Sequence, residues 1–319
     1  MKIYNLLKII IQSLLLILCY GCAGAILQEA AKGDTAKVQE LLNKGVNVND
    51  ISSNGYTPLY AAAEKGRTDT IKLLLARGAN PNYQMASDSC CPGWTSLMIA
   101  AANGHTQAVQ VLIDSGADVN TRNKFGRTAL MFVSKYGYTS IMKLLLEAGA
   151  TVDIQPNDKT ERNALLAAAG QGHAGAVSML IDYGADINLA DNDGYNALFA
   201  ATTAGHVRVV KVLIDKGADL NIRNRTGNTP LALAINEGYF QIAKALLDAD
   251  ADPNMTSMYM STPLMVACQK GDRDMVQILL DKGAVINARN IFGTTALGYA
   301  TSSGRKDIIE LLQKAGATE

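Results

Sequence analysis

Cysteine and histidine are the side chains of this sequence best suited to chemistry, and both are scarce. The 319 residues include five cysteines and three histidines: Cys19, Cys22, Cys90, Cys91, Cys268, His105, His173 and His206. The adjacent pair Cys90 and Cys91 could form a redox switch or bind a soft metal ion, because thiolates favour such ions. No second group of ligands accompanies the pair, so this interpretation remains an alternative.

The histidines do not form a ligand set of the kind that zinc requires. Each follows a glycine at the same place in a recurring pattern, which predicts a structural role. The sequence contains no nucleophile-elbow motif, no phosphate-binding glycine loop and no His-x-x-x-His pair. Cys268 takes an alanine-like position and is expected to be a small buried hydrophobe. The sequence therefore predicts no enzyme, no metal site and no cofactor.

The composition argues against a nucleic-acid partner. Lysine plus arginine and aspartate plus glutamate both number 29, so the formal net charge is +0. Without an excess of positive charge, the protein has no global field that would attract DNA or RNA. Aromatic residues make up only 6% of the chain, which makes their positions informative.

A repeat organises the whole chain. A motif leucine recurs at eight positions with intervals of 38, 33, 35, 33, 33, 33 and 33 residues: Leu59, Leu97, Leu130, Leu165, Leu198, Leu231, Leu264 and Leu297. A fixed period of this size is typical of a stacked repeat array.

One copy predicts two helices and an extended loop. Thr229 can cap the start of a helix while Pro230 occupies its first turn at little cost. Gly238 ends this helix, and a second apolar helix and a glycine follow in each copy. The remaining segment, ADLNIRNRTGN, is rich in turn formers and predicts a loop with a tight turn at Thr226 and Gly227.

The segments NTPLALAINEG, STPLMVACQKG and TTALGYATSSG align without a gap with NALFAATTAG, and the chain resembles ankyrin-repeat proteins from Gly24 to Thr318. The resemblance implies a mostly α ankyrin-repeat solenoid of helix-turn-helix units with extended β-turn or hairpin loops. About nine repeats would fill residues 23–319, with a short N-terminal copy and a polar C-terminal helix as caps. It also implies that the histidines hydrogen-bond the adjoining loops.

Residues 1–22 have the pattern of a bacterial-type secretory signal, with Lys2 and Lys8 before an apolar run that is short for a membrane span. Gly21-Cys22 resembles the end of a lipoprotein signal, in which Cys22 becomes lipidated. Cleavage near Ala23-Gly24-Ala25 would instead give a secreted protein, and an uncleaved product is a third route. We expect a lipid-anchored protein on the periplasmic side of the cell envelope.

Two copies carry insertions before the motif leucine, in the turn. In the copies of Leu165 and Leu264, Glu161 and Met260 replace the turn glycine, which predicts wider turns there. Asp250 likewise replaces the glycine that ends a second helix.

The resemblance places a partner-binding groove along the turn tips and the exposed end of each first helix. These positions gather a set of aromatic, basic and methionine side chains: Tyr56, Trp94, Lys124, Phe125, Arg127, Lys135, Tyr136, Lys159, Arg162, Tyr195, Arg225, Met258, Tyr259 and Phe292. Aromatic residues with arginine are typical of binding hot spots, and the cations would favour an acidic protein. An alternative is that individual rings pack on the next loop.

We therefore expect a monomeric, non-enzymatic module that binds a protein partner in this groove. One version is an inhibitor or immunity protein that covers an enzyme or toxin in the same compartment. A redox or metal-dependent protein using Cys90 and Cys91, or a purely structural spacer, are the alternatives.

Overall fold

The structure is a computed structural model that describes residues 24–86, 91–157, 162–191 and 193–318. These residues form eighteen α-helices and no strand, which confirms the predicted mostly α fold of helix-turn-helix units. In chain order the helices are α2 (Ala25–Lys32), α3 (Thr35–Asn43), α4 (Pro58–Glu64), α5 (Thr68–Ala76), α6 (Ser96–Ala102), α7 (Thr106–Asp114), α8 (Ala129–Tyr136), α9 (Thr139–Glu147), α10 (Ala164–Gln171), α11 (Ala174–Asp182), α12 (Ala197–Thr203), α13 (Val207–Asp215), α14 (Pro230–Asn236), α15 (Phe240–Asp248), α16 (Pro263–Lys270), α17 (Arg273–Asp281), α18 (Ala296–Ser302) and α19 (Lys306–Lys314).

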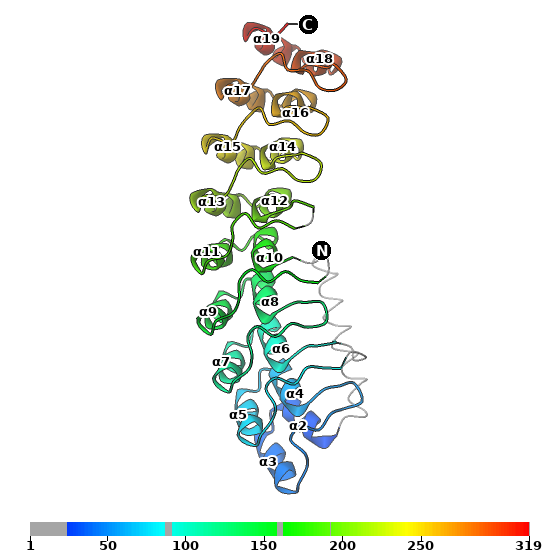
Figure 1. The fold of residues 1–319 in the computed structure, drawn as a ribbon, viewed down its shortest axis with the longest axis vertical. Coiled ribbons are helices and arrows are strands. Elements are labelled where there is room, and N and C mark those ends of the chain that lie inside the picture. Colours follow the sequence, from blue (N-terminus) through cyan, green and yellow to red (C-terminus); the bar gives the residue numbers. More distant parts are fainter. Residues whose placement is uncertain (1–23, 87–90, 158–161, 192, 319) are drawn as a thin grey trace. The chain divides into compact units, whose positions relative to one another are not determined.

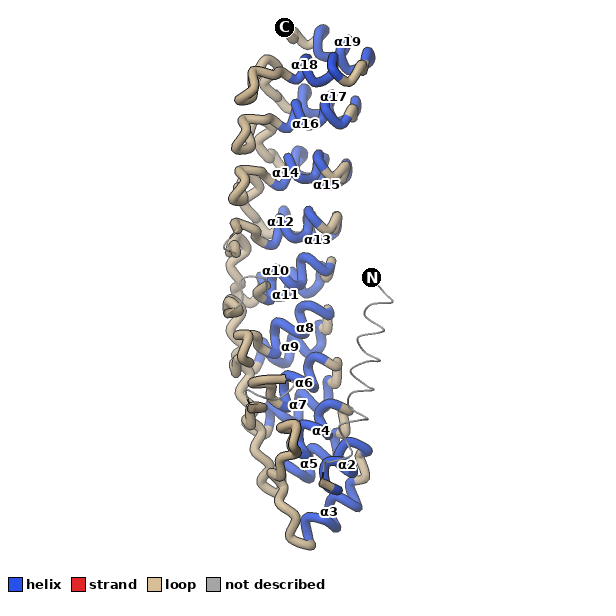
Figure 2. The backbone as a smooth tube through the Cα atoms, turned by 90° about the vertical axis from the view of Figure 1, so that its right-hand side faces the viewer, coloured by secondary structure: helices blue, strands red, loops and turns tan. Residues whose placement is uncertain are grey.

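The chain divides into two compact units, Met1–Glu161 and Arg162–Glu319. The boundary falls in the lengthened turn before Leu165. Within each unit the first helices of the repeats stack on one another, and the second helices form a parallel layer beside them (Figure 1). The loops between repeats leave the helices on one side (Figure 2).

The predicted caps explain where the first helices begin. The Thr229 hydroxyl accepts a hydrogen bond from the Ala232 backbone N–H at 3.2 Å, and Pro230 follows in the first turn. The same cap forms at six other first helices, through Thr57, Thr95, Asn163, Asn196, Thr262 and Thr295. Each such cap contributes about 1 kcal/mol to helix stability.

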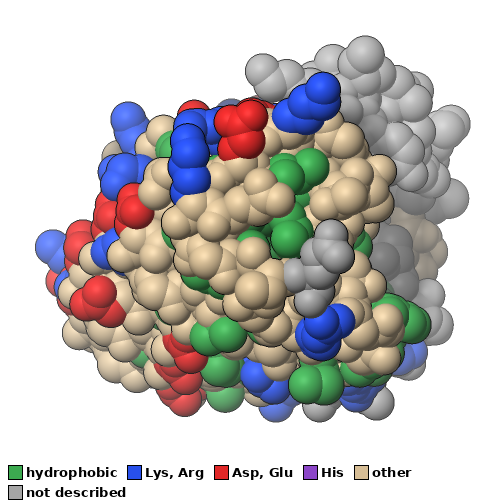
Figure 3. Space-filling view, turned by 90° about the horizontal axis from the view of Figure 1, so that it is seen from above, with side chains coloured by type: hydrophobic (Ala, Val, Ile, Leu, Met, Phe, Trp, Pro, Cys, Tyr) green, Lys and Arg blue, Asp and Glu red, His purple; other side chains and the backbone are tan. Residues whose placement is uncertain are grey.

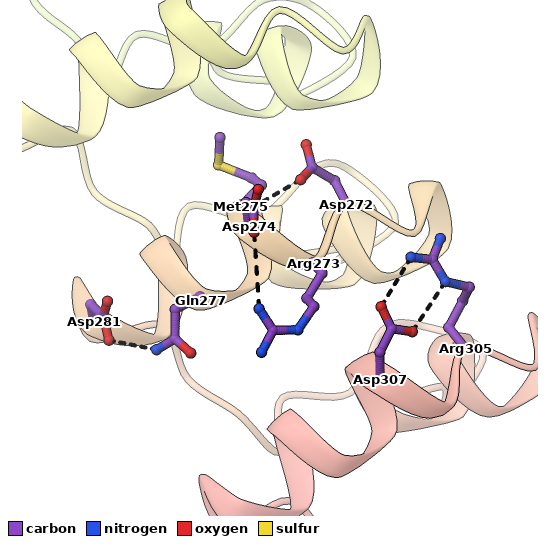
Figure 4. A network of polar contacts seen from close by, with 8 residues as sticks. All are labelled: Asp272, Arg273, Asp274, Met275, Gln277, Asp281, Arg305 and Asp307. Carbon is purple, nitrogen blue, oxygen red and sulfur yellow. Dashed lines mark hydrogen bonds and ion pairs between the residues drawn. The ribbon is translucent and has the colours of Figure 1, made fainter.

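The core consists of leucines and alanines shared between neighbouring repeats. All eight motif leucines are at most 7% exposed. The last helix, α19, buries only Ile308 and Leu312, as expected of a cap with one free side. At this end Asp272 caps α17 and Arg305 pairs with Asp307 at 3.2 Å (Figure 4).

In five of the described tight turns, a polar side chain at the start fixes the shape of the turn. The Asn224 side-chain oxygen accepts from the backbone N–H groups of Thr226 and Asn228, at 3.1 and 3.0 Å. Gly227 also donates to the Asn224 carbonyl at 2.8 Å. The same pair of side-chain bonds recurs at Asn123, Asp191, Ser257 and Asn290.

Backbone hydrogen bonds join the tips of successive turns. Met258 donates to the Thr226 carbonyl at 3.2 Å, and Ile291 donates to the Tyr259 carbonyl at 3.1 Å. In the first unit Asn157 donates to the Phe125 carbonyl at 2.9 Å. The turns are thus tied to their neighbours as well as closed on themselves.

Asparagines of the recurring G-A-D-x-N segment link neighbouring repeats. The Asn254 side-chain oxygen accepts from the Val285 N–H at 2.7 Å, and its amide donates to the Gly283 carbonyl at 3.1 Å. The same two bonds form at four other positions, Asn49, Asn82, Asn120 and Asn287. This segment therefore does more than make a turn, which was the role predicted for it.

The expectation of a wider turn at Met260 is wrong. Met260 takes the left-handed conformation of the glycine it replaces, with φ of 56°, and Ser257 still donates to the Ser261 carbonyl at 3.0 Å. Asp250 does the same, with φ of 63°. Glu161 lies outside the described residues.

The structural role of the histidines is confirmed for two of them. The His105 Nε2 atom lies 2.9 Å from the Glu64 carbonyl oxygen of the preceding repeat, and the His206 Nε2 atom lies 3.2 Å from the Gly170 carbonyl oxygen. The His105 ring also covers Gly66, where a Cβ atom would come within 2.6 Å of it. His173 lies at the N-cap of α11.

We predict that Asn254→Ala lowers the free energy of unfolding by about 1–2 kcal/mol, because it removes two hydrogen bonds between repeats. Urea denaturation followed by circular dichroism would measure this change. Gln277→Ala, which removes only a bond to Asp281 of the same helix, is the matched control and should cost less than about 0.5 kcal/mol. Equal effects of the two substitutions would contradict the role given to Asn254.

Candidate protein-binding surface

The predicted binding residues fall on both units, and each unit presents its own group. The first unit has Tyr56, Trp94, Lys124, Phe125, Arg127, Lys135 and Tyr136, and the second has Arg162, Tyr195, Arg225, Met258, Tyr259 and Phe292. Lys159, Cys22 and Cys90 lie outside the described residues.

Trp94 is partly buried by a neighbouring repeat. Its ring centroid lies 4.4 Å from that of Phe132, which belongs to α8 of the next repeat and is 6% exposed. The Trp94 backbone is held as well, since its carbonyl accepts from the Met85 N–H at 3.0 Å. Trp94 therefore contributes to the stack and offers only part of its ring to a partner.

Phe125 is a ring that the stack leaves free. It stands at the tip of the turn held by Asn123 and is 42% exposed. The Arg127 guanidinium carbon lies 5.5 Å from the Phe125 ring centroid, close enough for a cation–π interaction. Lys124 beside it is exposed. This turn thus presents an apolar ring together with positive charge.

A second aromatic group stands at the end of α8. Tyr136 is 48% exposed, lies 5.8 Å from Tyr138 between ring centroids and has the Lys135 ammonium 5.8 Å from its own centroid. Burial raises the pKa of the Tyr136 hydroxyl, Tyr138 raises it further, and Arg127 opposes both. The Tyr136 hydroxyl therefore remains protonated at neutral pH and can donate a hydrogen bond to a partner.

Tyr56 and Tyr195 occupy the same position of the repeat, three residues before the motif leucine, and have similar surroundings. Each ring lies 5.1 Å from a buried ring of its own first helix, Tyr60 and Phe199 respectively. Both tyrosines are of intermediate exposure. The alternative was that rings pack on the next loop. These three rings pack instead on helices: Tyr56 and Tyr195 on their own first helix, and Trp94 on the first helix of the next repeat.

The cations of the surface are balanced locally more than the sequence suggested. Arg225 forms an ion pair of 2.7 Å with Asp193 of the preceding turn. In the first unit the mostly buried Glu64 lies 3.7 Å from Lys65, and burial raises the pKa of this carboxyl while Lys65 lowers it. The exposed Arg225–Asp193 pair contributes little stability. Neither Asp193 nor Glu64 belongs to the predicted binding residues, which are aromatic, basic or methionine side chains.

The second unit carries the most exposed apolar side chains. Met258, Tyr259 and Phe292 all lie at turn tips, and the Tyr259 and Phe292 rings stack with centroids 6.5 Å apart. Met260 and Ile291 are each 53% exposed beside them and were not predicted as binding residues. Ile291 occupies a turn-tip position that the pattern already marked, whereas Met260 stands where other copies have glycine.

The end face seen in Figure 3 has positive and negative side chains interspersed around its edge, with apolar side chains exposed among them at the lower right. No block of a single charge sign covers this face. Arg162, at the other end of the second unit, extends over Gly170 of α10, where a Cβ atom would meet its guanidinium at 2.3 Å.

The described residues offer little support for chemistry. Within them, no group of three or more His, Cys, Asp and Glu side chains lies close enough to hold a metal ion. Cys268 is fully buried, as predicted, and burial raises its pKa to about 12, so its thiol is inert at neutral pH. Cys91 is half-buried. In the same part of the chain, every helix is too short or too polar to cross a membrane.

Comparison with known proteins identifies the family. The family model described as ankyrin repeats (3 copies) matches residues 9–85, 85–156, 165–257 and 252–318. The chain belongs to the ankyrin-repeat family. Ankyrin repeats generally bind protein partners, and membership of this family indicates a non-enzymatic protein–protein interaction module.

The curated relatives are similar over short segments only. A 2-5A-dependent ribonuclease of Mus musculus is 41% identical over 59 residues, which are 18% of this chain and 8% of that protein. Ankyrin repeat, SAM and basic leucine zipper domain-containing protein 1 of Carollia perspicillata is 45% identical over 51 residues, 16% of this chain and 11% of that protein. Its counterpart in Echinops telfairi is 42% identical over 52 residues, 16% of this chain and 11% of that protein. These matches concern the repeats and bring no ribonuclease activity to this chain.

We predict that Phe132→Ala lowers the free energy of unfolding by about 3–5 kcal/mol, because it removes a buried ring. The substitution should also shift the fluorescence of Trp94, the single tryptophan of the chain, to longer wavelength as water reaches the ring. Phe125→Ala removes an exposed ring and is the control, with a change below about 1 kcal/mol. An unchanged emission maximum in Phe132→Ala would contradict the Trp94–Phe132 contact.

Proposed function

We propose that this protein binds a protein partner along the turn tips and the exposed ends of the first helices. The observation that supports this best is the contrast between the backbone and the side chain of Phe125. Its N–H donates to the Asn123 side chain and its carbonyl accepts from the Asn157 N–H, while its ring remains 42% exposed. A rigid backbone that presents an exposed ring loses little entropy when a partner covers that ring.

The partner should carry acidic groups near apolar ones. In the first unit Arg127 lies over the Phe125 ring and Lys135 over the Tyr136 ring, and Lys124 is the exposed residue before Phe125. Carboxylates beside an apolar contact would therefore meet cations there. The module would act as a monomer that offers this surface to its partner.

We further propose that the module is exported and lipid-anchored at Cys22 on the periplasmic side of the envelope, with simple secretion as the alternative. The lysines before a short apolar run and the Gly21-Cys22 pair support this proposal. In that compartment the module could inhibit an enzyme or neutralise a toxin by covering its surface, and this version rests on analogy with other binding modules.

We predict that Phe125→Ala combined with Tyr136→Ala reduces partner recovery at least tenfold in a crosslinked pull-down from envelope extracts. Loss of two hot-spot rings typically removes more than 1 kcal/mol each. Quantitative mass spectrometry would compare the proteins recovered by the variant and the wild type. These residues are preferable to Trp94, whose removal would also weaken the stack.

The matched control is Tyr183→Ala, which removes a tyrosine of similar exposure at the C-terminal end of α11, away from the turn tips. It should recover the same proteins as the wild type. If the double variant also recovers them in equal amounts, the proposed surface of the first unit is not used for binding.

We predict that the chain incorporates an alkyne-tagged fatty acid when produced in a bacterial host, and that Cys22→Ser abolishes the incorporation. Gel fluorescence after attachment of a dye to the alkyne would measure it. Cys19→Ser changes a neighbouring cysteine that cleavage would remove, and it should leave the signal intact. A wild-type chain without label would refute the lipid anchor and favour the secreted form.

A further inference from the structure

We propose that the second unit holds a separate docking site for an extended segment of a protein partner that bears alternating large apolar side chains and nearby carboxylates. The site, called here the C-terminal apolar patch, consists of Met258, Tyr259, Met260, Ile291 and Phe292. The inference rests on the proposed function, since it assumes that the protein binds other proteins, and it specifies what one part of the surface recognises.

The patch is apolar, continuous and accessible. Its five side chains are between 53% and 74% exposed, and they come from two turns whose backbones are joined by the bond from Ile291 to the Tyr259 carbonyl. The stacked rings of Tyr259 and Phe292 form its centre. Methionines at its edge, with flexible and polarisable side chains, can adapt to different apolar groups.

The backbone of Met260 is strained, and glycine at this position would build the same turn without that strain. Its φ of 56° is unfavourable for a residue with a side chain, and the corresponding turns of the other repeats use glycines such as Gly227 and Gly293. The turn forms the same backbone bonds with either residue. A strained residue with an exposed side chain points to a use for that side chain.

The arginines around the patch favour a partner segment that carries carboxylates. The three successive turns at 222–229, 255–262 and 288–295 contain Arg223, Arg225 and Arg289 and no aspartate or glutamate. Arg225 is paired with Asp193, while Arg289 donates to the Gly293 carbonyl at 2.9 Å and so stays in the turn of Phe292. A segment with carboxylates beside its apolar side chains complements this arrangement.

The dimensions of the patch favour a segment over a second copy of the chain. Five half-exposed side chains offer roughly 400–500 Å², whereas a stable interface needs about 800 Å² from each partner. An extended chain places every second side chain on one face, about 6.6 Å apart. This spacing matches the 6.5 Å between the Tyr259 and Phe292 centroids. Apolar residues at i and i+2 could therefore each contact one ring.

A random peptide library displayed on phage and selected on the full chain would test the proposal. We expect enriched peptides with large apolar residues at i and i+2 and at least one neighbouring Asp or Glu. A fluorescent synthetic peptide of the enriched sequence should bind Phe292→Ser at least tenfold more weakly than the wild type, measured by anisotropy. Val285→Ser, which changes an apolar residue of 54% exposure outside the turn tips, is the control and should bind normally.

Met260→Gly separates binding from folding. Glycine relieves the strained backbone, so the variant should unfold about 2–4 °C higher while it binds the peptide severalfold more weakly. This opposite change cannot come from a misfolded variant. Unchanged peptide affinity in both Met260→Gly and Phe292→Ser would overturn the proposal.

Other outcomes would also overturn it. Enriched basic peptides would contradict the selection by charge, and no enrichment would contradict a segment as occupant. A dimer seen by analytical ultracentrifugation and lost in Phe292→Ser would make the patch a self-association surface. Peptides that bind Phe292→Ser normally but fail to bind Phe125→Ala with Tyr136→Ala would support the proposed function and reject only this site.

Discussion

Each helix pair of this protein is stable only because neighbouring pairs cover its apolar face. The motif leucines and the alanines around them are buried between successive repeats, so the core is a series of contacts between neighbours. The polar groups follow the same rule. Loop asparagines such as Asn254 bond the next repeat, and several turn tips bond the tip that follows. Apart from Trp94, the aromatic side chains at the turn tips are not needed to bury the core, and this is why they are available for a partner.

Much of the fold could be predicted from the sequence because it is determined by local preference and by a period. Thr229 and Pro230 define a helix start through bonds within four residues, and the spacing of the motif leucines reveals the stack. Contacts between repeats were harder to predict from the sequence. The role of Asn254 depends on backbone groups some thirty residues away, so the sequence indicated only a turn. At Met260 the sequence predicted a wider turn, because methionine does not prefer a left-handed conformation. The bonds of Ser257 and the neighbouring turn impose that conformation nevertheless.

The candidate site was predictable in position but not in exposure. The pattern locates Trp94, Phe125 and Phe292 equally well at turn tips. Only the structure shows that Trp94 packs on Phe132 of the next repeat, whereas Phe292 is the most exposed of the three rings. The positions of the charged residues were likewise predictable, but their pairing was not. The Arg225–Asp193 ion pair joins two successive turns and cannot be predicted from either turn alone.

The asparagine bonds between repeats have a mechanical consequence within each unit. Every such bond connects only two adjacent repeats, and the bonds follow one another in series along the stack. A pulling force applied along a unit is therefore transmitted through every junction, and the weakest junction yields first. We expect a unit under tension to lengthen in steps, one repeat at a time, because each repeat contacts only its neighbours.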